Sequence, residues 1–329
     1  MIKVGIRRGE QLESIHHIKV SVINSKGKSL FSSGNNKDLT YPRSAMKIFQ
    51  SIPLVISGAA EHYNLNDKQL AISSSSHFGE SNHIKILENW IKKISINQKY
   101  LQCGIHNPLN LNTSNNLLFS RKKPQLIHNN CSGKHLGMLT TCKFKKYNLK
   151  NYTHFNHPIQ KSILGILENF FEFKSKQKLK AIDGCSAPQY AFPLENLALG
   201  MMKISIFDKL RFDLAYSINK LLYCISNNPY YIGGTGRFDS DLIKITKGRI
   251  FCKIGAEGVL MFADLKNKFG GILKVNDGNQ RAIPSATINL LKKLKSLNTN
   301  ELAKLKKWNP EILYNHSSKK IGKIFTYKF

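Results

Sequence analysis

The chain of 329 residues is poor in acidic side chains, in arginine and in long hydrophobic runs. Its 20 aspartate and glutamate residues face 50 lysine and arginine residues, which gives a formal net charge of +30. Only eight of the basic residues are arginine, at positions 7, 8, 43, 121, 211, 237, 249 and 281. Arginine is the side chain that reads base edges and grips phosphates with two N–H groups. Because most of the charge comes from lysine, it argues against specific nucleic-acid recognition. A basic nucleic-acid-binding protein remains an alternative, and it predicts an affinity that falls steeply with salt concentration.

The longest apolar stretch, near residues 48–60, contains Gln50, Ser51, Pro53 and Ser57 and is too short to cross a bilayer. The first ten residues lack the apolar core of an export signal. Six cysteines, at positions 103, 131, 142, 185, 224 and 252, show no spacing typical of a small disulfide framework. We therefore expect a cytoplasmic protein without a membrane segment, whose cysteines are thiols or metal ligands.

Strand-like segments lie at both ends of the chain, and helical spacing of apolar residues fills the middle. This order predicts an α+β fold with one central antiparallel sheet built from both chain ends. We expect a single domain over 1–329, with a sheet portion of 1–43 and 227–329 and a helical portion of 44–226. The expected strands are 2–7, 18–24, 29–32, 249–253, 259–264, 271–275 and 321–329. The expected helices are 84–94, 132–147, 158–171, 194–202, 207–226 and 281–294, with another from Ser44 past Pro53 and a long loop over 107–125.

Ser44 and Lys47, in P-R-S-A-M-K (42–47), are three residues apart and share one face of a helix. A neutral lysine in that position takes the serine proton, and burial or a second cation lowers its pKa. A helix N-terminus also offers unpaired backbone N–H groups to an oxyanion. The S-x-x-K pattern is weak by itself, because several other serines have lysine three residues on. Its context, after Tyr41-Pro42 and before an apolar helix, singles out Ser44.

Two further segments add hydroxyl and ammonium groups. In C-K-I-G-A-E-G (252–258), Lys253 would end a strand, and Gly255 would let a backbone or ligand approach closely. S-x-x-K at a helix start followed far downstream by K-x-G on a strand is the order found in serine β-lactamases. In S-S-S-S-H-F-G-E-S (73–81), Ser76 is a candidate nucleophile or proton relay. The alternatives are an edge-strand lysine at 253 and a flexible linker at 73–81.

Two cysteines lie beside turns. N-N-C-S-G-K-H-L-G-M-L (129–139) contains Cys131, and D-G-C-S-A-P (183–188) contains Cys185 beside Asp183. Two thiolates with one more donor can hold zinc, although a buried cysteine without a metal is common. The first segment also fits a helix start capped by Asn130. Several carboxylates and arginines, among them Arg237 and Asp239, likewise stay beside glycine turns in this lysine-rich chain, which suggests function.

Taken together, these segments resemble the Rhizobium etli type of L-asparaginase, the asparaginase II family. The resemblance runs over nearly the whole chain. It is carried in order by R-G-E-Q-L-E-S-I-H (8–16), Y-P-R-S-A-M-K (41–47), S-H-F-G-E (76–80), C-G-I-H-N-P-L (103–109), N-N-C-S-G-K-H-L-G-M-L (129–139), D-G-C-S-A-P (183–188), G-T-G-R-F-D (234–239), K-I-G-A-E-G (253–258) and D-G-N-Q-R-A (277–282). It implies a fold similar to serine β-lactamases and glutaminases, hydrolysis of L-asparagine to aspartate and ammonia, and a homodimer.

The resemblance also implies particular site residues. These are two serine–lysine pairs, Ser44 with Lys47 and Ser76 with Lys253; a zinc ion held by Cys131, Lys134 and Cys185; and substrate contacts from Arg43, His135 and Asp183. The chain departs from the family pattern at Ile48, where proline is common, and at Ser186, where glycine is usual. Neither change removes a reacting group, but Ser186 leaves the substrate preference open.

The hypothesis is acyl transfer, in which a serine activated by neutral lysine attacks the side-chain amide of asparagine and water hydrolyses the ester. Ser44 is the favoured nucleophile, with Ser76 as relay. Zinc would orient the site rather than activate water, because two thiolate ligands suit that role. The alternatives are a glutamine-type or penicillin-type amide on the same fold, or a relic without turnover.

Overall fold

The computed structural model describes all 329 residues, and its largest element is an antiparallel sheet of eight strands. Seven strands follow the order β11-β12-β1-β2-β10-β9-β8, and β3 pairs with β2 outside this row. The strands are β1 (Ile2–Arg8), β2 (Gln11–Asn24), β3 (Ser29–Ser33), β8 (Ile250–Gly255), β9 (Val259–Asp264), β10 (Phe269–Val275), β11 (Glu311–Tyr314) and β12 (Lys320–Lys328).

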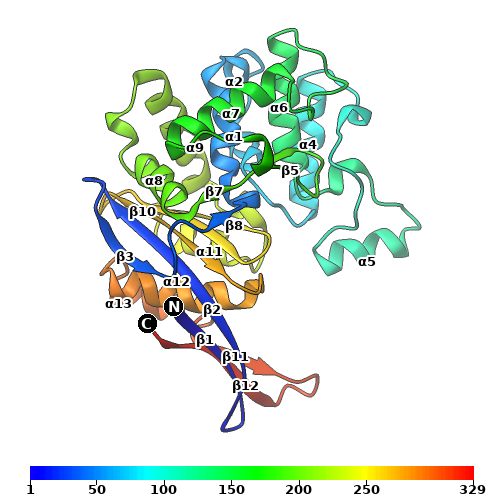
Figure 1. Cartoon of the computed structure of the whole chain (residues 1–329). Helices are drawn as coiled ribbons and strands as arrows, with labels where there is room; N and C mark the ends of the chain where they lie inside the picture. The colour runs from blue at the N-terminus through cyan, green and yellow to red at the C-terminus, as the bar shows by residue number, and fades with distance from the viewer.

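The two ends of the chain supply neighbouring strands of this sheet. Lys3 of β1 lies opposite Lys328 of β12, and the two termini lie close together in Figure 1. On its other edge β1 pairs with β2, which then pairs with β10, so that Lys19 lies opposite Lys274. The predicted sheet from both chain ends is therefore confirmed, and the α+β class with it.

Between β3 and β8 the chain forms a helical lobe, drawn from blue through green above the sheet in Figure 1. Helix α8 contacts β2, β9 and β10, while α12 contacts β1, β10 and β12. Two small sheets, β4 (Leu39–Thr40) with β7 (Phe192–Pro193) and β5 (Lys180–Ile182) with β6 (Pro188–Tyr190), also belong to this stretch. The helices are the 3₁₀ turn η1 (Arg43–Met46), α1 (Lys47–Ile56), α2 (Ala59–His62), α3 (Asp67–Ser73), α4 (Ser81–Lys93), α5 (Leu111–Phe119), α6 (Ser132–Phe144), α7 (Pro158–Phe171), α8 (Leu194–Ser205), α9 (Phe212–Asn227), α10 (Tyr230–Gly233), α11 (Phe238–Ile245), α12 (Ile283–Lys293) and α13 (Thr299–Lys304).

Local chemistry explains several of these boundaries. Asn66 and Gln69 form a capping box at the start of α3, which satisfies two backbone N–H groups. Pro158 occupies the first turn of α7, where its missing N–H costs nothing. The expected bounds of α7 and of β9 agree with the structure.

The expected long loop over 107–125 is wrong, because the structure contains helix α5 there. Asn110 caps this helix by accepting a hydrogen bond from the backbone N–H of Thr113. No residue of α5 is buried, and Leu111 and Phe119 are exposed. A helix that buries no face has no need of apolar residues at helical spacing, so the sequence carries no periodic signal for it.

One hydrophobic cluster joins the sheet to the lobe, since it contains both Val20 of β2 and Leu136 of α6. At this boundary, the turn before α1 lies directly against the end of β8. A Cβ atom on Gly255 would come within 2.5 Å of the carbonyl oxygen of Pro42 and 3.1 Å of the amide nitrogen of Ala45. Only glycine allows this approach, which places the start of α1 beside β8. None of the helices combines the length and apolar character that crossing a membrane requires.

Candidate active site

Lys47 is a fully buried lysine at the start of α1, and its ammonium nitrogen faces the segment before α4. Its Nζ atom donates to the backbone oxygen of Ser75 and lies 3.0 Å from Oγ of Ser76. Lys47 was expected to pair with Ser44, and the hydrogen bonds that the structure gives its Nζ atom go to Ser75 and Ser76. The long lysine side chain instead reaches into the lobe, where the Ser75 carbonyl holds Nζ against Ser76.

The surroundings of Lys47 favour its neutral form. Burial is the largest cause that lowers the pKa of this lysine, and the nearby cations Lys134 and Lys253 lower it further. The thiol groups of Cys131 and Cys185 act in the opposite direction. The net result is a pKa below the ordinary lysine value, so that the amine is prepared to accept a proton.

Ser44 and Ser76 line one cavity of about 200 Å³ at the boundary between the sheet and the lobe. Its walls come from the η1 turn, the 76–78 segment, the loops before α5, α6 and α11, the end of β8 and the segment before α12. The lining residues are Ser44, Ser76, Phe78, Leu109, Asn130, Arg237, Ile254, Gly255, Ala256 and Gln280. The two candidate serines are thus brought to the same small space, as a shared catalytic role requires.

Lys253 lies on β8 and is almost completely buried. Its Nζ atom lies 2.8 Å from Oδ2 of Asp239 and donates to the carbonyl oxygen of Ile254 at 3.0 Å. The predicted hydrogen-bonded pair of Ser76 with Lys253 is therefore not formed, because the Asp239 carboxylate takes the ammonium group. Burial acts to raise the pKa of Asp239, but Lys253 and Arg237 outweigh it and lower the pKa. Lys253 thus forms a buried ion pair with Asp239 close enough to Lys47 to lower the pKa of Lys47.

Arg237 lines the cavity. The sequence pattern shows this arginine beside a glycine turn but does not predict it as a site residue. Its guanidinium carbon lies 4.5 Å from the ring centre of Phe78. The Nε atom of Arg237 is buried and has no hydrogen-bond partner. Asp239 was likewise noted without being placed in the site. A signal for both lay in the G-T-G-R-F-D segment, where an arginine and an aspartate are kept in a lysine-rich chain.

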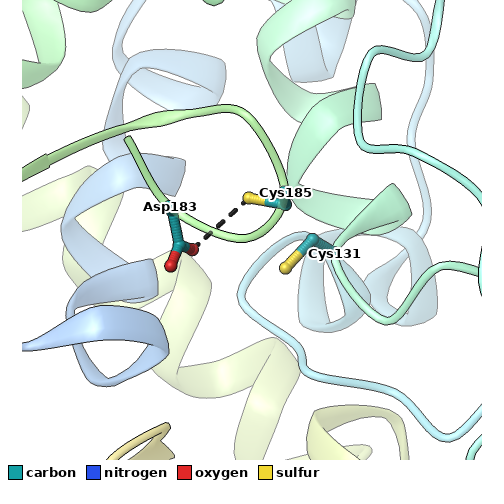
Figure 2. Close-up of side chains that lie close together, drawn as sticks. All are labelled: Cys131, Asp183 and Cys185. Atoms are coloured by element: carbon teal, nitrogen blue, oxygen red, sulfur yellow. Dashed lines mark hydrogen bonds between the residues drawn. The ribbon is translucent and has the colours of Figure 1, made fainter. Parts of the chain in front are cut away.

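The two cysteines expected to bind metal come together with Asp183 (Figure 2). The possible ligand atoms of Cys131, Asp183 and Cys185 all lie within 4.8 Å of one another. Cys131 directly precedes α6, and Cys185 lies in the turn between β5 and β6. The side chain of Lys134 reaches the same place, with its Nζ atom 2.9 Å from Sγ of Cys185.

The charges in this cluster are coupled. A hydrogen bond from Cys131 and the ammonium group of Lys134 lower the pKa of Cys185 to about 5, although burial opposes the thiolate. The same hydrogen bond, with burial, raises the pKa of Cys131 to about 12. Burial opposes the charge of Asp183 as well, but Lys134 and Arg43 lower its pKa to about 2. Sγ of Cys185 lies between Lys134 at 2.9 Å and Oδ2 of Asp183 at 3.4 Å, and Oδ1 of Asp183 accepts from Arg43, so opposite charges meet in this cluster (Figure 2).

The donor chemistry fits a zinc ion. Two sulfur atoms and a carboxylate oxygen are ligand types that zinc takes in proteins, and a lysine nitrogen lies 2.9 Å from one of the sulfurs. Metal binding would have to release the protons of Cys131 and Lys134, because both must coordinate in their deprotonated forms. Burial acts to lower the pKa of Lys134, but Cys185, Cys131 and Asp183 outweigh it and raise that pKa, so metal binding would have to displace a firmly held proton.

The residues expected to contact substrate lie near this cluster rather than on the walls of the cavity. Arg43, just before Ser44, donates from Nε to Oδ1 of Asp183 at 2.7 Å. Its backbone φ of +52° is in the left-handed region, a strained conformation for an arginine. His135 is fully buried, and its Nδ1 atom lies 2.6 Å from the hydroxyl of Tyr152. The Nε2 atom of His135 has no partner.

The departure from the family pattern at Ser186 has a structural counterpart. Ser186 has a φ of +67°, and its N–H donates to the carbonyl oxygen of Asp183, which closes the turn that carries Cys185. Glycine adopts this conformation without the Cβ strain that serine experiences. The turn therefore keeps its shape at the cost of local strain.

A family model described as L-asparaginase II matches residues 4–326. No curated protein sequence matches the chain. Among solved structures, a beta-lactamase-like protein from Bacteroides dorei DSM 17855 is 9% identical, with 84% of this chain and 93% of that chain covered and a TM-score of 0.41. The protein Mglu in its Tris and glutamate form is 11% identical, with 85% of this chain and 59% of that chain covered and a TM-score of 0.38. At these TM-scores, the two likenesses carry no argument about this chain's chemistry. Because the family model spans almost the whole sequence, the chain belongs to the L-asparaginase II family and is an amidohydrolase of the asparaginase type.

Proposed function

We propose that this protein hydrolyses the side-chain amide of L-asparagine to L-aspartate and ammonia, with Ser44 as the nucleophile. One observation carries the proposal: a buried lysine without a carboxylate partner hydrogen-bonds to Ser76 in a cavity that also holds Ser44. A lysine beside a hydroxyl acts as a general base more readily when its pKa is lowered, as it is here.

In the proposed first step, Oγ of Ser44 bonds to the amide carbon while its proton passes to Ser76, and the Ser76 proton passes to Nζ of Lys47. The carbon–nitrogen bond then breaks, and the leaving nitrogen takes the proton back from Lys47 and departs as ammonia. Water then attacks the aspartyl ester and gives a proton to Lys47. Lys47 returns a proton through Ser76 to Oγ of Ser44 as the ester bond breaks, which releases aspartate and restores the Ser44 hydroxyl. Both serines and Lys47 therefore have distinct parts in one chain of proton transfers.

Backbone N–H groups supply the proposed oxyanion site. The amide groups of Ser44 and Ala256 donate no backbone hydrogen bond, and both residues line the cavity. Two such donors aimed at a developing oxyanion are worth several orders of magnitude in rate. This arrangement favours Ser44 over Ser76 as nucleophile, because the backbone N–H of Ser76 is already bonded to the carbonyl oxygen of Ile232 at 2.9 Å.

Lys253 and Asp239 have the proposed role of setting the pKa of Lys47. The buried Lys253 cation lowers that pKa, and Asp239 keeps Lys253 charged and in place. Both act without contact with the amide. They are positioning residues for the base, in contrast to the second catalytic pair implied by the resemblance.

We also propose that Cys131, Lys134 and Cys185 hold zinc, with Asp183 beside them. When bound, the ion would supply a fixed positive charge that orients the site, since two thiolate ligands suit a structural or modulating role. The two cysteines are the groups that raise the pKa of Lys47. A cation on them would cancel that influence and keep Lys47 neutral.

The size of the cavity favours a small substrate. About 200 Å³ is below the roughly 300–1,000 Å³ typical of pockets for drug-sized ligands, so an amino-acid amide fits better than a penicillin-type amide. Ammonia release from L-glutamine is measured beside that from L-asparagine to rank the two substrates.

We further propose a cytoplasmic homodimer, as the resemblance implies. Light scattering of the purified protein at two concentrations tests the dimer.

Rapid quenching of the enzyme with L-asparagine, followed by mass spectrometry of its peptides, tests the nucleophile. The expected result is an aspartyl ester on the peptide that contains Ser44, with none in the Ser44→Ala variant. An ester on Ser76 would overturn the assignment of the nucleophile and leave the reaction itself intact. Turnover in Ser44→Ala at a rate near the wild type would overturn the acyl-enzyme route through Ser44.

A further inference from the structure

We propose that Arg237 binds the carboxylate of the substrate and is the residue that selects carboxylate-bearing amides. The inference rests on the proposed function, because it places its ligand in the same cavity. Arg237 is the only charged residue among those that line the cavity, and no acidic side chain is among them. A wall with one cation and no anion attracts a negatively charged ligand group.

The pairing of the other arginines shows that Arg237 is unusual. Five arginines pair with carboxylates in the structure, namely Arg7, Arg8, Arg43, Arg211 and Arg249. Arg281 donates to His16 and Ser14, and Arg121 is exposed to solvent. Arg7 and Arg237 each have a buried Nε atom without a partner, but Arg7 lies 3.9 Å from the Glu10 carboxylate, whereas the partly buried Arg237 makes no ion pair. A buried donor without an acceptor costs about 1–3 kcal/mol, which a bound carboxylate would recover.

The nearest carboxylate is not available to Arg237. Asp239 lies two residues along the chain, and its charge is already shared by Lys253 at 2.8 Å and the backbone N–H of Ile254 at 3.3 Å. Its other oxygen accepts from the backbone N–H of Ser240. Asp239 therefore makes no ion pair with Arg237, and the guanidinium group keeps its N–H donors for a ligand.

Phe78 fixes the orientation of the guanidinium group. The Arg237 Cζ atom lies over the Phe78 ring at 4.5 Å from its centre, which is a cation–π contact. The contact to Phe78 uses none of the guanidinium N–H groups as hydrogen-bond donors to a protein oxygen, so they remain for a ligand. An edge with parallel N–H groups matches the two oxygens of a carboxylate. Phe78 and Arg237 both line the cavity, and Phe78 lies two residues after Ser76, so the pair is part of the wall that also carries this serine.

The proposed ligand class is thus a small ω-amide that carries a carboxylate near the amide, such as L-asparagine. Its carboxylate would bind Arg237 while its amide carbon lies at Ser44. A ligand of the same size without the negative charge would lose the ion pair and leave Arg237 buried without a partner. Discrimination should therefore depend on substrate charge more than on substrate size.

Steady-state kinetics with a charged and an uncharged substrate test this assignment. We compare L-asparagine with L-asparagine methyl ester, in the wild type, Arg237→Gln and Arg237→Lys, and measure ammonia from the side-chain amide. Arg211→Gln is the matched control, because Arg211 is exposed and pairs only with Asp213. Truncating one partner of a buried charge pair changes binding by roughly 100-fold.

The wild type and the control should prefer L-asparagine over its methyl ester by about 100-fold in kcat/KM. Arg237→Gln should lose most of that preference through a KM for L-asparagine raised about 100-fold, with kcat changed much less. Arg237→Lys should recover part of it, because an ammonium group keeps the charge without the fork. Unchanged KM and unchanged preference in Arg237→Gln, with an active wild type, would overturn the inference.

Binding of succinate to the Ser44→Ala variant separates this inference from the proposed reaction. Calorimetry should give a dissociation constant that rises about 100-fold when Arg237→Gln is added. A wild type that releases no ammonia would defeat the proposed function, yet the succinate titration would still decide whether Arg237 binds carboxylates. Succinate binding that is equal with and without Arg237 would overturn the inference even if the enzyme is active.

Discussion

Replacing Asp239 with asparagine should destabilise the protein strongly, because it removes one partner of a fully buried ion pair. The side chains of Lys253 and Asp239 are 1% and 0% exposed, and their charged atoms lie 2.8 Å apart. Asparagine has nearly the same shape as aspartate, so the Asp239→Asn variant removes the charge and little else. Both oxygens of Asp239 accept hydrogen bonds, Oδ2 from Lys253 and Oδ1 from the backbone N–H of Ser240, so the NH2 group of asparagine would face a donor in either orientation.

The expected loss follows from the burial of both groups. Breaking a buried pair by removing one partner costs about 3–5 kcal/mol, because the other charge stays buried and uncompensated. An unfolding entropy of about 2.1 cal/mol/K per residue gives about 0.7 kcal/mol/K for 329 residues. The melting temperature should therefore fall by about 4–7 °C.

Differential scanning calorimetry and urea unfolding at pH 7 measure this change. At pH 7 Asp239 makes its full contribution to the free energy of unfolding. The pKa of Asp239 is lower in the folded protein than its unfolded value of 3.8, so this contribution is lost only as the pH falls from 3.8 towards the folded pKa. The double variant Asp239→Leu with Lys253→Met is the control, since it removes both charges and should recover much of the loss. A loss below about 1 kcal/mol in Asp239→Asn, or a double variant no more stable than the single one, would refute the reasoning.

Three further changes have defined outcomes. Ser186→Gly should raise the free energy of unfolding, measured in urea, by about 0.5–1 kcal/mol. Serine at φ +67° is strained, and relief of that strain should exceed the entropy that glycine adds to the unfolded chain. A loss of stability would contradict this. The value of kcat/KM should rise with pH through a pKa below 10.5 and then level, since Lys47 accepts a proton only when it is neutral. The residual activity of Lys47→Met should lack this rise. A midpoint at or above 10.5 would count against Lys47 as the base. Cys185→Ser should lose most of its zinc by elemental analysis while Cys142→Ser, a buried cysteine outside the cluster, keeps it; equal zinc in both would remove the proposed metal site.

The fold was predictable where local patterns and packing agree. Strand β9 and helix α7 have the predicted bounds, because apolar residues, a Pro158 start and glycine turns all point to the same limits. Helix α5 was missed because it buries no residue and so has no apolar face to detect. The interior end of β2 was also predictable, but its outer half from Gln11 is a largely exposed hairpin arm that carries no buried pattern.

The sequence pattern predicts which residues belong to the site, but it does not predict which of their side chains contact one another. Ser44, Lys47 and Ser76 do meet at one boundary, yet which hydroxyl Lys47 contacts depends on how α1 packs against the 73–77 segment. Lys253 pairs with Asp239 because α11, the helix directly before β8, packs against this strand, a contact that spacing along the chain does not reveal. Arg237 was visible only as a retained arginine beside glycines.

The most direct test of the central claim is ammonia release from L-asparagine by the purified protein, beside Ser44→Ala and Ser76→Ala. The account predicts that the wild type releases ammonia and aspartate in equal amounts. It predicts that Ser44→Ala loses at least about 1,000-fold in kcat, and that Ser76→Ala loses less, because water can replace a relay but not the nucleophile. No ammonia from the wild type with zinc present, or an active Ser44→Ala variant, would contradict it.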